Sequence, residues 1–166
     1  MNSDFEQVIA QYSPLLSRVA SSYEANHHLH QELLQEISVA VWQALSSFKG
    51  NSSVKTYILR VAHNKAVNHV AYHARQPRNE AYCEVTKPSA SSAPSSEQNM
   101  SQQQQVQGLL VAIRKLPLHP RQILTMSMEG LSYQEIAEVC GIQLNNVGVI
   151  LNRSKKILSE ALQDEE

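Results

Sequence analysis

The chain has 166 residues, of which 42% are apolar, with five glycines and six prolines, so it is long enough for one core or two small ones and is not of low complexity throughout. Its formal net charge of -1 argues against a protein that holds nucleic acid by bulk charge alone. The sequence has no secretion signal and no apolar run of membrane-spanning length, and its two cysteines, Cys83 and Cys140, form no disulfide or zinc pattern, so we expect a cytoplasmic protein.

Residues 1–80 are expected to form a first helical domain. Apolar residues recur at three- and four-residue steps from Phe5 to Tyr23, and Pro14 should kink or split that helix. A second seam has four members at helical spacing: Leu33, Ile37, Val41 and Leu45. After a turn around Gly50, a third helix is expected from about residue 54 to residue 74, and no strand-like alternation occurs.

The sign of the charge changes within this domain. Residues 1–47 contain five acids and only one base, whereas residues 48–78 contain six bases and no acid. This distribution favours a protein that contacts another protein on one side and nucleic acid on the other. A solvated charge pattern without a partner is the alternative.

Residues 81–105 are expected to be a flexible linker. From residue 86 they read TKPSASSAPSSEQNMSQQQQ, which has no hydrophobic periodicity and too little apolar surface to offset the entropy of ordering. The fold class is therefore predicted to be all-α, with two small helical domains joined by this linker.

Residues 106–166 are expected to form the second domain, with a helix-turn-helix. Pro117 ends one helix, another begins near Pro120, and Gly130 follows its end. Ser132 and Glu135 have the spacing of a capping box, and a turn containing Gly141 precedes the last helix. This pattern favours DNA binding through the second helix, and an ordinary helical hairpin is the alternative.

Two segments resemble the extracytoplasmic-function (ECF) sigma factors of bacterial RNA polymerase. Residues 30–70, with the sequences ELLQE, FKG and YILRVAHN, are similar to sigma domain two. Residues 116–158, above all GLSYQEIAEVCGI, are similar to sigma domain four. The resemblance implies a non-enzymatic subunit that binds core RNA polymerase through its clamp helices and flap and directs promoter recognition, DNA melting and transcription initiation. An anti-sigma factor is a candidate further partner.

The resemblance assigns three groups of residues. Core polymerase would contact an acidic helix bearing an aromatic anchor, comprising Glu32, Leu33, Gln35, Glu36, Val39 and Trp42. A core position is the alternative for Trp42. The minus-ten element would be read and melted by amides, hydroxyls, an aromatic ring and bases, comprising Asn51, Ser52, Ser53, Lys55, Tyr57, Arg60, Asn64, Lys65 and Asn68.

The minus-thirty-five element would be read by the helix-turn-helix, through Ser132, Tyr133, Asn145, Asn146, Val149, Ile150, Arg153, Lys155 and Lys156. Here the chain departs from the family, because Gly148, Val149 and Ile150 stand where polar and basic residues are usual. Asparagine suits adenine and apolar side chains suit thymine methyl groups, so we expect a weaker or A·T-biased contact. The alternative is that this helix face binds a protein.

The remaining features add no cofactor. His27, His28 and His30 lie together in a polar turn, but without a second ligand cluster we expect no metal there. No nucleophile motif, phosphate loop or carboxylate pair predicts catalysis. The rival functions are a helix-turn-helix regulator that binds DNA alone and a degenerate sigma factor that acts through protein partners.

Overall fold

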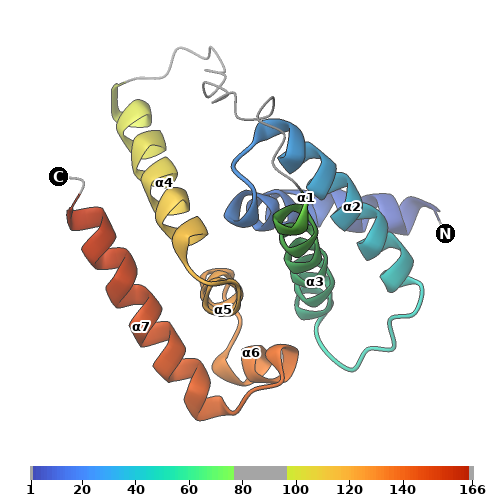
Figure 1. Cartoon of the computed structure of the whole chain (residues 1–166). Helices are drawn as coiled ribbons and strands as arrows, with labels where there is room; N and C mark the ends of the chain where they lie inside the picture. The colour runs from blue at the N-terminus through green and yellow to red at the C-terminus, as the bar shows by residue number, and fades with distance from the viewer. Residues whose placement is uncertain (1, 77–96, 165–166) are drawn as a thin grey trace.

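The computed structural model describes residues 2–76 and 97–164, and these ranges contain seven helices and no strand. The all-α prediction is therefore confirmed for them. The first unit consists of α1 (Asn2–Tyr23), α2 (His27–Leu45) and α3 (Val54–Arg75). The second unit consists of α4 (Glu97–Lys115), α5 (Leu118–Met128), α6 (Tyr133–Cys140) and α7 (Leu144–Gln163). Figure 1 shows α7 running beside α4, with α5 and α6 turned toward the first unit.

The core of the first unit lies where α2 meets α1 and α3. The predicted seam is confirmed at Leu33, Ile37 and Val41, which are fully buried, and Leu45 is partly buried. Helix α2 begins after Asn26, whose side chain accepts a hydrogen bond from the Leu29 amide. This cap satisfies one of the donors that every helix leaves free at its start.

Helix α1 is continuous through Pro14, so the predicted split is wrong. Proline removes one backbone hydrogen bond and crowds the preceding turn. Downstream of Pro14, however, Leu15, Leu16 and Val19 are buried in the core, and this burial holds the helix across the defect.

Helix α4 begins at Glu97, nine residues before the predicted start of the second domain, so residues 97–105 are helical. Glutamine has good helix propensity, and the polar run therefore extends a helix that is anchored further on by the buried Ala112 and Ile113. Residues 81–96 of the predicted linker lie outside the described ranges.

The helix-turn-helix signals are confirmed in detail. The Ser132 hydroxyl accepts from the Glu135 amide, and the Glu135 carboxylate accepts from the Ser132 amide, which completes the capping box. Gly141 ends α6 with φ of 67°, in the left-handed region that glycine adopts without strain. The Ile142 amide then donates to the Ala137 carbonyl, which closes the helix end before α7 begins.

Candidate nucleic-acid interface

One face of α2 is acidic and carries an exposed tryptophan. Trp42 and Val39 are 54% and 52% exposed, so the alternative of a core tryptophan is wrong. The Trp42 ring meets Phe5 of α1 edge-on, with the ring centroids 6.0 Å apart, and this contact orients the indole. Glu32, Gln35 and Glu36 are exposed on the same helix. These residues form a surface of the kind that a partner with basic side chains can bind.

Leu33 does not belong to that surface. Its side chain is fully buried between the helices of the first unit, so it cannot contact a partner directly. The sequence motif contains it because a helix that presents acids on one face must bury apolar residues on the other.

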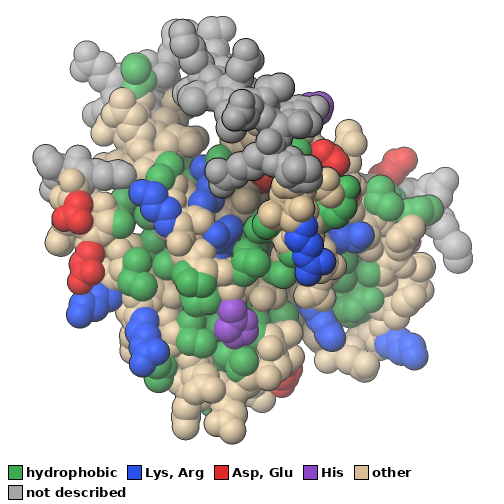
Figure 2. Space-filling model, viewed as in Figure 1, with side chains coloured by type: hydrophobic (Ala, Val, Ile, Leu, Met, Phe, Trp, Pro, Cys, Tyr) green, Lys and Arg blue, Asp and Glu red, His purple; other side chains and the backbone are tan. Residues whose placement is uncertain are grey.

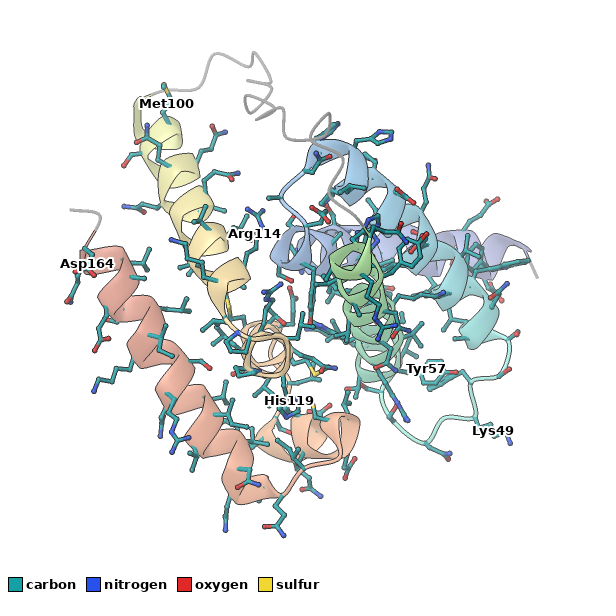
Figure 3. All side chains as sticks on the ribbon, in the orientation of Figure 1. Lys49, Tyr57, Met100, Arg114, His119 and Asp164 are labelled. Carbon is teal, nitrogen blue, oxygen red and sulfur yellow. The ribbon has the colours of Figure 1, made fainter. Side chains whose placement is uncertain are left out.

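The loop between α2 and α3 shapes a recess of about 260 Å³. Tyr57 lines it, and its hydroxyl donates to the Ala44 carbonyl at 2.9 Å while its ring packs on Phe48 at 4.9 Å between centroids. Asn51, Ser52 and Arg60 also line this recess. Figure 3 shows Tyr57 beside the loop that carries Lys49. Amide and hydroxyl groups around an aromatic ring can accept an unstacked base.

Ser53 has a structural task in addition to the predicted one. It is the N-cap of α3, where its hydroxyl accepts from the Thr56 amide at 3.1 Å and donates to the Thr56 hydroxyl at 2.8 Å. Both interactions hold the start of α3, and they leave the exposed Ser53 hydroxyl one acceptor lone pair for a base. Asn51 and Ser52 are also exposed at the loop, where the Ser52 hydroxyl donates to the Ser53 carbonyl at 3.2 Å.

A polar and basic track follows α3 away from the recess. Arg60, Asn64, Lys65 and Asn68 are all exposed, at the three- and four-residue spacing that places side chains on one helix face. Lys65 and Asn68 share a surface groove with Glu32 and Glu36 of α2. The track therefore adjoins the acidic face. Figure 2 shows Lys and Arg side chains over both units in this view.

Helix α7 presents the predicted reading residues with one exception. The exposed residues of α7 are Asn145, Asn146, Val149, Arg153, Lys155 and Lys156. Tyr133 of α6 and Ser132, which caps that helix, are also exposed. Ile150 instead packs partly against the core, which leaves it less surface for a ligand. Leu144, which sequence reasoning missed, is 53% exposed at the start of α7. This face of α7 is thus amide-rich and apolar at its start and basic further along.

Gly148 sits beneath an aromatic ring. A methyl group added there would lie 3.6 Å from Cε2 of Tyr133, an ordinary contact distance. The glycine is therefore not required by backbone conformation or by space.

Beneath the α3 track lies a histidine that the sequence did not single out. His63 is fully buried, and its Nδ1 is 2.9 Å from the Tyr23 hydroxyl. Burial lowers the pKa of His63 to about 3, because the apolar surroundings penalise the charged imidazolium. Arg121 of α5 lies over the Tyr23 ring at 5.4 Å and connects this group to the second unit.

Within residues 2–76 and 97–164, no three His, Cys, Asp or Glu side chains are grouped so that they could hold a metal ion. Of the three neighbouring histidines, His30 points back to α1, where its Nε2 is 3.1 Å from the Ser21 hydroxyl. None of the helices described is both long and apolar enough to cross a membrane. Cys83 lies outside the described ranges.

Comparison with known proteins identifies both units. Residues 8–76 match the family Sigma-70 region 2, and residues 107–158 match Sigma-70, region 4. The chain is 29% identical to the RNA polymerase sigma-H factor of Pseudomonas aeruginosa, over 80% of this chain and 72% of that protein. It is 28% identical to the RNA polymerase sigma factor YlaC of Bacillus subtilis, over 86% of each. The ECF RNA polymerase sigma-E factor of Haemophilus influenzae is 23% identical over 96% of this chain and 87% of that protein.

Solved structures show the same fold. The sigma factor RpoE of Bartonella quintana, crystallised with the anti-sigma factor NepR, has a TM-score of 0.74 and 20% identity, covering 98% of this chain and 99% of that one. CnrH, in complex with the cytosolic domain of CnrY, has a TM-score of 0.71 and 18% identity, covering 100% of this chain and 92% of that one.

A helical protein that carries regions 2 and 4 of sigma-70 in this order is a sigma factor, which is not a class of enzyme. The chain belongs to the ECF group of RNA polymerase sigma factors.

Proposed function

We propose that the first unit docks on core RNA polymerase through the acidic face of α2 and reads and opens the minus-ten element with the recess and α3, while the second unit contacts the minus-thirty-five element. The observation that carries this proposal is the junction of two unlike surfaces on one small unit. Trp42 and Glu36 stand on one helix, and the track of Arg60, Asn64 and Lys65 follows the next.

Each surface suits a different ligand. A half-exposed tryptophan among carboxylates suits a basic protein surface, where it would fill a pocket while the acids pair with cations. An aromatic recess beside a basic track suits single-stranded DNA, because the recess can hold an extruded base while the cations neutralise phosphates. Opening the duplex in this way needs no covalent chemistry and no cofactor.

The side chains of the second unit suit an upstream DNA contact that favours A·T base pairs. The exposed Asn145 and Asn146 can pair with adenine, and Val149 can pack on thymine methyl groups. Arg153, Lys155 and Lys156 can hold phosphates. We therefore propose an A·T-biased minus-thirty-five contact, in a cytoplasmic protein that works beside its polymerase. The complex of the similar RpoE with NepR supports an anti-sigma factor as a further partner.

Binding to purified core polymerase tests the docking face. Trp42→Ala should weaken binding at least tenfold, as expected when a hot-spot aromatic is truncated. Met100→Ala is the matched control, because Met100 is 53% exposed but lies on α4, outside the proposed surfaces. Equal binding by the two variants would remove α2 from the interface.

A promoter with 2-aminopurine in the minus-ten element tests the recess. With core polymerase at saturation, Arg60→Ala should reduce the fluorescence rise that reports opening, while core binding stays unchanged. Opening at the wild-type level would show that the α3 track does not handle the melted strand.

A further inference from the structure

A buried histidine near the end of α3 lies between two carboxylates. The side chain of His69 is 1% exposed, and its Nε2 is 3.2 Å from a carboxylate oxygen of Glu24, which follows α1. Its Nδ1 is 3.9 Å from a carboxylate oxygen of Glu36 on α2. Both ring nitrogens therefore face an acid, and the contact with Glu24 is the closer one.

The charge of the His69 ring determines how it acts on these two acids. A neutral imidazole has one N–H, so it donates to one acid and turns a lone pair toward the other. An imidazolium has two N–H groups and a positive charge, so it attracts both acids at once. Because the contact with Glu24 is the shorter, Glu36 is the acid that gains most from the second N–H. Histidine is the side chain that changes charge between about pH 5 and pH 8.

Other titratable groups lie around this ring. The groove between α2 and α3 is lined by Glu32, Glu36, Lys65, His69, Tyr72 and His73. The ring centroids of His73 and His69 are 4.3 Å apart, so a proton on His73 opposes one on His69. Lys65 also opposes that proton, and Glu32 favours it. The Arg114 guanidinium of α4 is attracted to Glu24. Glu24 and Glu36 are the carboxylates within ion-pair distance of the ring.

Glu36 belongs to the acidic face of α2 that is proposed to dock on core polymerase. Its side chain is 44% exposed, so it can meet a cation of a partner from outside while His69 meets it from inside. An imidazolium on the inner side would repel that cation across the carboxylate. Such coupling is reciprocal, so a partner cation on Glu36 also favours loss of the proton from His69.

We propose that the charge of His69 regulates docking on core RNA polymerase. The protonated ring holds Glu36 in an ion pair and weakens docking, and the neutral ring releases the carboxylate for a cation of the polymerase. His69 is buried, so it acts through Glu36 as a positioning residue. The inference rests on the proposed docking function of the α2 face. Docking is therefore expected to weaken as the pH falls from 8 to 6.

Dissociation constants of the full chain for purified core polymerase, measured from pH 6 to pH 8, test this inference. Wild type should bind about fivefold more weakly at pH 6 than at pH 8, at the lower end of the usual range for coupled sites. His69→Gln should bind at pH 6 as wild type binds at pH 8, because the glutamine amide carries no charge at either pH. Glu36→Gln should bind more weakly at pH 8 and should also lose the dependence. His63 stays neutral across this range, because burial lowers its pKa to about 3.

Two further variants identify the histidine responsible. His119→Gln replaces an exposed histidine of the second unit and should keep the full dependence on pH. Glu24→Gln leaves His69 in place but removes a carboxylate that favours the imidazolium, so the midpoint of the docking profile should move about one pH unit lower. This shift decides the matter if His69→Gln does not fold. Long-range ¹H–¹⁵N NMR spectra of the free chain follow the charge of the His69 ring directly.

The outcomes separate this inference from the proposed function. Equal binding by wild type at pH 6 and pH 8, or a dependence that His69→Gln retains, would overturn the inference. A ring of His69 that keeps one charge state from pH 6 to pH 8 would overturn it as well, whatever the polymerase does. No binding to core polymerase at any pH would instead contradict the proposed function, and the regulation of docking would fall with it.

Discussion

One buried histidine should make this protein less stable in acid. His63 is fully buried and its pKa is lowered to about 3, whereas in the unfolded chain it returns to the usual 6.5. The unfolded state therefore binds the proton more tightly. The contribution of His63 to the free energy of unfolding is intact above pH 6.5 and is lost as the pH falls toward 3. Each unit by which the pH falls within that window lowers the free energy of unfolding by about 1.4 kcal/mol. The loss between pH 7.5 and pH 4.5 is about 3 kcal/mol.

Urea unfolding at half-unit pH steps, followed by circular dichroism, measures this slope. His63→Phe should flatten it by about 3 kcal/mol over the same range, whatever the stability of the variant at neutral pH. His119→Gln is the matched control, because His119 is a histidine on the exposed surface of the second unit. If His63→Phe does not fold, Tyr23→Phe keeps the imidazole buried and should retain the wild-type slope. Equal slopes for wild type and His63→Phe would refute the reasoning.

Three further predictions concern the second unit. Gly148→Ala should raise the free energy of unfolding by about 0.5–1 kcal/mol and the melting temperature by about 1–4 °C, because alanine has the higher helix propensity and its methyl only touches Tyr133; a lower melting temperature would show that the helix cannot take the methyl. Arg121→Ala should cost about 2 kcal/mol in chemical unfolding, since the carbonyls of Arg114 and Leu116 lose their buried donor; a cost near zero would mean that water replaces it. Val149→Arg should strengthen holoenzyme binding to duplex promoter DNA and steepen its salt dependence; unchanged DNA binding with altered protein binding would assign this face to a partner.

Local chemistry made much of the fold predictable. The capping box at Ser132 and the turn at Gly141 depend only on neighbouring residues, and both are present as expected. The seam through Leu33 and Ile37 was readable because a buried helix face repeats every three to four residues. The predicted split at Pro14 was wrong because the cost of proline inside a helix is outweighed by the burial of the residues that follow it. The local sequence does not reveal that burial.

The functional surfaces were less accessible to sequence reasoning. Trp42 could be placed on a helix, but only the packing of α1 and α3 determines that the ring faces outward. The capping role of Ser53 was not anticipated, because a hydroxyl that caps a helix has the same sequence signature as one that reads a base. The bond between Thr56 and Glu135 joins residues 79 positions apart, and no periodicity or motif reports such a pair.

Run-off transcription with purified core polymerase on a library of randomised promoters tests the central claim most directly. The account predicts transcripts that depend on this protein, share a minus-ten motif and carry an A·T-rich minus-thirty-five element, and that disappear with Trp42→Ala at limiting protein. Absence of protein-dependent transcripts, together with no binding to core polymerase, would contradict it.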